Sequence, residues 1–199
     1  NMSFSRVLEL AALGQRVFGE NRVQEAASKI PETASRWEGA RLGWRMIGHL
    51  QRNKVKPAVL LFDAIDSVDS LRLCDALDRE AAACQRVLPV LFEFNCSGEA
   101  QKSGFRPDEL PALVDRVRTL ESLEPQGLMT MGPASMEPDA SRSAFQELRR
   151  LRERMEQALG HALPHLSMGM SGDLEVGIEE GATLVRVGTA LFGDRGGAH

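Results

Sequence analysis

Short apolar runs alternate along the chain with longer segments in which apolar residues recur every three or four positions. Several of the short runs are apolar on both faces, a pattern typical of buried parallel strands. They predict seven strands, at Arg16–Phe18, Trp44–Gly48, Ala64–Val68, Val87–Asn95, Gln126–Met131, Leu166–Gly169 and Leu184–Gly188. The longer segments predict amphipathic helices between the strands, so the chain repeats a strand–helix unit.

Two helical segments show their apolar stripe most clearly. The first stripe consists of Leu110, Leu113, Val114, Val117 and Leu120, and the second of Phe145, Leu148, Leu151, Met155 and Leu159. We expect both stripes to pack against the core rather than to form a groove for a partner. Prolines at 107, 111 and 138 lie where helices are expected to begin, a position that tolerates proline.

The order of these elements predicts a TIM-type (β/α)8 barrel. Seven strand–helix units follow one further helical segment over Ser3–Leu13, which is the count of such a barrel without its first strand. A doubly wound open sheet is the competing architecture, but the junction Phe18–Asn21 is not a dinucleotide-binding fingerprint. No linker separates two units, so we expect one domain over residues 1–199, lacking its N-terminal helix and first strand.

Composition narrows the class of protein. The 199 residues are 43% hydrophobic and 26% charged, the balance of a single globular domain. Twenty-four Lys and Arg against 28 Asp and Glu give a net charge of −4, which disfavours non-specific nucleic-acid binding and requires any phosphate site to be local.

The cysteines and the apolar runs indicate a cytoplasmic protein. Cys74, Cys84 and Cys96 show neither disulfide-framework nor zinc-ligand spacing, which favours a reducing compartment. No apolar run approaches the roughly 20 residues that span a bilayer, and the first residues lack the pattern of a signal peptide. We expect neither a membrane nor a nucleic-acid partner, and a monomer by default.

The turns after the last two predicted strands carry the candidate ligand site. In a barrel, ligands bind at the carboxyl ends of the strands, and phosphate commonly binds after strands seven and eight. Ser167–Asp173 forms a Gly/Ser-rich turn that offers backbone N–H groups and a hydroxyl, and Gly188 and Thr189 offer a second such turn. Ordinary helix capping explains either turn alone, whereas the two together favour one shared phosphate site.

Arg186 stands out because it interrupts the apolar run Leu184–Val187. A buried charge is costly without a partner, so we expect this side chain to point into the barrel mouth toward a ligand. A buried salt bridge with Asp or Glu is the structural alternative.

Further polar residues at or near strand ends are Asn21, Asn95, His49 and Lys102. The side-chain amides of Asn21 and Asn95 either position a ligand or cap a helix. The imidazole of His49 either stacks on a ring, transfers protons or is structural. The lysine lies either on the functional rim or in an exposed loop. A short basic run of Arg52, Lys54 and Lys56 either binds a second anion or covers a solvated helix face.

Six segments in order carry a resemblance to a known family. They are Phe18–Asn21 with Gln24 and Glu25, Ile47–Gln51 with Asn53 and Lys54, Lys102–Gly104, Gly127–Met131, Leu166–Ser171 and Val185–Gly193. Together they resemble the pyridoxal 5′-phosphate (PLP) homeostasis protein family, single-domain relatives of the alanine racemase barrel. The resemblance covers essentially the whole chain.

The resemblance implies a PLP-binding barrel. In it, the phosphate would be held by Ser167, Gly169, Met170, Ser171, Gly188 and Thr189. Arg186 would face the pyridine nitrogen, and Asn21 would lie beside the cofactor. The family carries its cofactor lysine in a first strand that this chain lacks. We therefore expect the Schiff-base lysine immediately before Asn1, and no catalytic residue within the chain.

The implied function is intracellular PLP homeostasis, with the cofactor carried or buffered and PLP-dependent apoenzymes as candidate partners, which would affect amino-acid and keto-acid metabolism. A PLP-dependent amino-acid racemase or lyase is the alternative. An arginine cannot stabilise a proton on the pyridine nitrogen, and the chain has no tyrosine to serve as a base, so we expect weak racemase activity at most. A barrel enzyme acting on a sugar phosphate is the third candidate.

Overall fold

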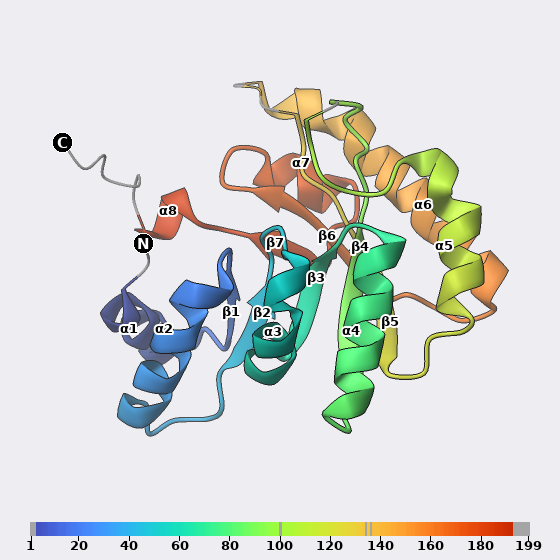
Figure 1. Ribbon diagram of the computed structural model, residues 1–199. Coiled ribbons are helices and arrows are strands. Elements are labelled where there is room, and N and C mark those ends of the chain that lie inside the picture. Colours follow the sequence, from blue (N-terminus) through green and yellow to red (C-terminus); the bar gives the residue numbers. More distant parts are fainter. Residues whose placement is uncertain (1–2, 100, 134, 136, 193–199) are drawn as a thin grey trace.

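The computed structural model describes residues 3–99, 101–133, 135 and 137–192. Within them, seven strands form one parallel sheet in which each strand pairs with the next one along the chain (Figure 1). The strands are β1 (Val17–Glu20), β2 (Gly43–Met46), β3 (Ala64–Val68), β4 (Leu88–Glu93), β5 (Leu123–Met129), β6 (His165–Met170) and β7 (Leu184–Arg186). All seven predicted strands are confirmed.

A helical segment follows every strand, as the strand–helix rhythm predicts. The α-helices are α1 (Phe4–Ala12), α2 (Val23–Arg36), α3 (Val55–Leu61), α4 (Leu71–Ala83), α5 (Leu110–Val117), α6 (Arg142–Leu159), α7 (Leu174–Glu179) and α8 (Thr189–Phe192). Short 3₁₀ turns precede three of them: η1 (Arg52–Lys54), η2 (Pro107–Glu109) and η3 (Pro138–Ser141). None of the described helices is long and apolar enough to cross a membrane.

The boundary of β5 differs most from the prediction. This strand begins at Leu123, three residues before the expected start, although Glu124 and Pro125 do not look like strand residues. They are ordered by pairing with Leu88–Val90 of β4, followed by a register shift. Tertiary pairing thus overrides local propensity here.

Polar side chains inside the sheet show that it curves into a barrel. Arg45 of β2 donates from Nε and Nη2 to both oxygens of Asp66 on β3, over 2.7 to 3.0 Å. Burial lowers the pKa of His165 at the start of β6, and the charge of Arg45 lowers it further. In a flat sheet β2 and β6 would be about 19 Å apart, so these side chains interact because the sheet wraps around them.

The order of the strands excludes a doubly wound open sheet, the competing architecture. The strand order β1 to β7 runs without reversal, whereas a doubly wound sheet reverses at a switch point. Within the described residues β1 and β7 are the two edges of the sheet and do not pair with each other. The fold is therefore a nearly closed parallel barrel.

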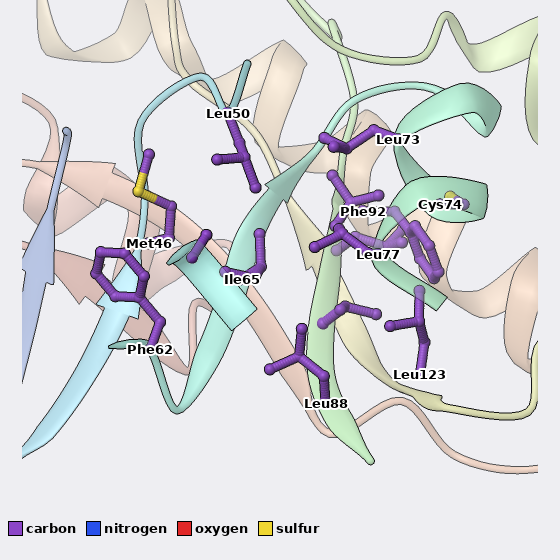
Figure 2. Packing of buried hydrophobic residues seen from close by; sticks show 14 of the residues in the cluster. Met46, Leu50, Phe62, Ile65, Leu73, Cys74, Leu77, Leu88, Phe92 and Leu123 are labelled. Carbon is purple, nitrogen blue, oxygen red and sulfur yellow. The ribbon is translucent and has the colours of Figure 1, made fainter. Parts of the chain in front are cut away.

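The predicted apolar stripes face the core. Leu110, Leu113, Val114 and Val117 of α5 are buried, as are the four residues of the α6 stripe from Phe145 to Met155. Figure 2 shows how Leu73, Cys74 and Leu77 of α4 pack beside Phe92 of β4 and Leu123 of β5. This layer of helices fixes the strands from outside and leaves their carboxyl ends free to carry the site.

Candidate functional site

The turns after β6 and β7 lie side by side, as the sequence predicts. The backbone N–H of Ala190, in the first turn of α8, donates to Oγ of Ser171, in the turn after β6, over 3.3 Å. The Met170 N–H donates to Oδ1 of Asp173 over 2.7 Å, and Ser141 Oγ donates to the other carboxylate oxygen over 2.6 Å. These bonds hold the turn after β6 in a fixed shape.

Glycines allow close packing at the turn after β6 and leave the backbone accessible at the turn after β7. Gly169 has a φ of +89°, and a Cβ atom placed on Gly177 would lie 3.0 Å from the Gly169 Cα, so α7 packs directly onto the end of β6. A Cβ atom on Gly188 would meet no heavy atom of the described residues within 4 Å. With respect to these residues, the turn after β7 borders open space in which a ligand group can approach the backbone.

Arg186 points inward from β7, as predicted. Its Nη1 donates to Oγ of buried Ser167 over 2.7 Å, and its Nη2 donates to the backbone oxygen of Thr130 over 2.8 Å. No carboxylate within the described ranges forms an ion pair with it, so the alternative of a buried salt bridge is wrong. Burial lowers the pKa of this guanidinium, although the charges of Asp66, Glu93 and Asp173 oppose that shift.

Glu93, at the carboxyl end of β4, is a site residue that the sequence analysis missed. Only 3% of it is exposed. Burial raises the pKa of its carboxyl group to about 7, and the charge of Asp69 adds to the rise, while Arg186 and His49 oppose it. The signal was available: Glu93 interrupts the apolar run 88–94 just as Arg186 interrupts 184–187.

His49 and Asp69 form the rim on the opposite side of the mouth. The His49 Nδ1 lies 2.7 Å from an Asp69 carboxylate oxygen, and the ring is more than half exposed. The imidazole is thus held in one orientation while it still reaches solvent.

Asn21 lies at the same end of the barrel, in the bend after β1, and is exposed. A Cβ atom on Gly48 would lie 2.3 Å from the Asn21 backbone oxygen, so this glycine allows the two segments to touch. The Asn21 side chain makes no hydrogen bond within the described residues and is not joined to the β6 and β7 turns. Met170 is the last residue of β6, and Thr189 is the first residue of α8. Both are exposed.

The two remaining candidates, Asn95 and Lys102, make hydrogen bonds that hold the loop after β4 in place. Asn95 donates from Nδ2 to the Glu99 backbone oxygen over 2.8 Å and accepts from the Gly98 N–H over 3.1 Å. Lys102 is partly buried and donates from Nζ to the Gly132 backbone oxygen over 2.7 Å, so it is a loop anchor rather than a free rim lysine. Gly193 and the lysine expected before Asn1 lie outside the described residues.

The chemistry of these residues fits a phosphorylated pyridine. The Ser171 hydroxyl accepts from the Ala190 N–H and keeps its own proton to donate, and among the described residues the space at Gly172 and Gly188 is open, which suits a phosphate. A guanidinium bound only by neutral oxygens has further N–H donors to give to a ring nitrogen. Within the described residues no cluster of His, Cys, Asp and Glu could hold a metal ion.

Comparison with known proteins agrees with this geometry. Residues 1–196 match the family model of the alanine racemase N-terminal domain. The chain is 42% identical to the pyridoxal phosphate homeostasis protein of Aquifex aeolicus, over 95% of this chain and 81% of that protein. It is 44% identical to the protein of the same name in Pseudomonas aeruginosa, over 95% and 79% of the two chains.

Solved structures give the same picture. PipY of Synechococcus elongatus with PLP bound superposes with a TM-score of 0.87 at 36% identity, over 97% of this chain and 89% of that one. An alanine racemase of Clostridium difficile superposes with a TM-score of 0.75 at 14% identity, over 96% and 49%. The second likeness concerns the fold alone.

Proposed function

Because this chain belongs to the pyridoxal phosphate homeostasis protein family, we propose that it binds PLP and holds it for intracellular cofactor homeostasis. The observation that carries the proposal is the placement of one inward arginine beside two adjacent donor-rich turns. A phosphate and a ring nitrogen need these two kinds of donor at one end of a barrel.

In this proposal the turns after β6 and β7 hold the phosphate, through Ser167, Gly169, Met170, Ser171, Gly188 and Thr189. The hydrogen bond between Ala190 N–H and Ser171 Oγ supports it, because it joins the two turns. Arg186 faces the pyridine nitrogen, and Asn21 lies beside the ring.

Bound PLP supplies an aldehyde that combines reversibly with amines and a ring that withdraws electrons. Arg186 donates hydrogen bonds and cannot accept one, so a ring nitrogen facing it stays unprotonated. An unprotonated ring withdraws electrons less strongly. The site residues therefore suit retention and release of the cofactor better than fast chemistry on an amino acid.

Equilibrium dialysis of PLP with the purified protein tests this assignment, with absorbance between 300 and 500 nm as a second readout. Arg186→Ala removes a charged contact and Ser171→Ala a hydroxyl in the phosphate turn, and each should weaken retention about tenfold. Arg154→Ala, which changes an arginine of α6 with no side-chain partner in the described structure, serves as the control. Unchanged retention in both site variants would contradict the pocket assignment.

The cellular setting belongs to the same proposal. We place the protein in the cytoplasm as a single PLP-binding domain that acts as a monomer and supplies PLP-dependent apoenzymes. The three cysteines, all free in the structure, support a reducing compartment. Gel filtration of the PLP-loaded protein tests the oligomeric state, and transfer of PLP to a purified apoenzyme tests the role.

A further inference from the structure

Two adjoining cavities, of about 490 and 510 Å³, open between η1 and the first turns of α4. They share three residues, Arg52 and Asn53 of η1 and Arg72 of α4. Arg79, two helical turns after Arg72, lines the second cavity. We refer to the two together as the η1–α4 cleft. Both cavities are shallow and open to solvent.

Arginines without partners are concentrated in this cleft. In the described part of the chain, the side chains of four arginines make neither a hydrogen bond nor an ion pair: Arg52, Arg72, Arg79 and Arg154. The first three line the cleft, whereas most other arginines bind a carboxylate or a backbone oxygen. Three cations held near one another without counterions repel one another unless an anion binds.

The carboxylates of the cleft do not neutralise these arginines, because each already has a partner. Asp69 lies 2.7 Å from His49 Nδ1, and Asp75 accepts a hydrogen bond from Arg116 Nε over 2.6 Å. Ser70, at the start of α4, makes no side-chain capping bond. Its hydroxyl therefore adds a further donor to the first cavity, which Arg72 also lines.

We propose that the η1–α4 cleft binds a phosphate group, either free or carried by a small organic phosphate. The cleft reaches the rim residues His49 and Asp69, and its arginines belong to neither of the turns after β6 and β7. Arg52 and Arg72 come from different elements and line the same cavity, so two planar guanidinium forks can bind one tetrahedral anion. The second cavity and Arg79 can take the organic part of an ester.

Other anionic partners fit less well. A nucleic acid would meet a chain of net charge −4, and none of the described residues that line the cleft is a Phe, Trp or Tyr on which a base could stack. The basic run of Arg52, Lys54 and Lys56 noted in the sequence does not act as one unit. Arg52 lines both cavities together with Arg72, whereas Lys54 and Lys56 line neither.

Titration of inorganic phosphate into the isotope-labelled full chain, followed by NMR of the arginine Nε–H groups at constant ionic strength, tests the proposal. The titration is run with PLP added and without it. We expect saturable shifts at Arg52 and Arg72 in both, and an affinity at least tenfold weaker in Arg72→Ala. Arg154→Ala, which changes the partnerless arginine outside the cleft, should bind phosphate like the wild type.

A parallel titration with glycerol 3-phosphate distinguishes the sources of the phosphate group. Equal affinities indicate a site for the free ion, whereas tighter binding of the ester that Arg79→Ala abolishes indicates an organic phosphate. Succinate, which carries the same charge on two carboxylates, controls for simple attraction. Shifts that do not saturate, that persist in Arg72→Ala or that succinate reproduces would overturn the proposal. A protein that fails to bind PLP yet shows the shifts would refute only the proposed function.

Discussion

Glu93 should destabilise the folded protein more at neutral pH than at acid pH, and Glu93→Gln should remove this contribution. Burial raises the pKa of this carboxyl from 4.5 to about 7. The carboxyl therefore binds its proton more tightly in the folded state than in the unfolded chain, and the contribution of Glu93 to stability falls as pH rises from about 4.5 to about 7. A shift of this size corresponds to ~3 kcal/mol above pH 7. Glutamine has nearly the same shape and no charge to desolvate.

Urea unfolding of the PLP-free protein at pH 4.5 and pH 8 measures this effect. Relative to the wild type, the free energy of unfolding of Glu93→Gln should rise by ~3 kcal/mol when the pH is raised from 4.5 to 8. Comparing two pH values removes any effect of the amide itself, since that effect is the same at both. Glu38→Gln, at an exposed position, should show no such growth. A pH-independent difference for Glu93→Gln would refute the reasoning.

Three further substitutions test the fold and the edge of the site. Cys96→Ser should leave the retention of PLP in equilibrium dialysis unchanged. Burial raises the pKa of this thiol to about 12, so in the wild type it should react slowly with thiol reagents at pH 8. Gly127→Ala would place a Cβ atom 1.9 Å from the His165 backbone oxygen and should cost ~2 kcal/mol or more in urea unfolding. Lys29→Met leaves Glu20, its buried partner at 2.5 Å, without a counterion, and should cost ~3 kcal/mol at pH 8 and less at pH 5.

The fold could be predicted because its signals are local. Each strand is a short apolar run and each helix a stripe of period 3.6, and the unbroken alternation of the two specifies the winding. The start of β5 could not be predicted, because Glu124 and Pro125 become strand residues only by pairing with β4. The polar pair Arg45–Asp66 was missed for a similar reason, since it forms between strands that the sequence separates by about twenty residues.

The inward direction of Arg186 could be predicted because a charged residue interrupts an apolar strand. The contact between the turns after β6 and β7 could be predicted from the barrel winding, whereas their role in binding a ligand stays a prediction. Whether Asn95 and Lys102 face a ligand or hold a loop depends on where their neighbours lie, which spacing alone does not give. The cleft arginines were only partly visible, because Arg52 and Arg72 become neighbours when α4 packs beside α3.

The strand that carries Arg186 is also a short edge strand of the sheet. β7 has three residues, pairs with β6 at only two positions, and has no partner on its other side within the described residues. In the proposed site, the cofactor phosphate would bridge the turns after β6 and β7 and so connect this edge to the rest of the barrel. The time for which the protein keeps its cofactor would then depend on how often β7 separates from β6, and a better-paired edge would slow release without any change in the groups that touch the ligand.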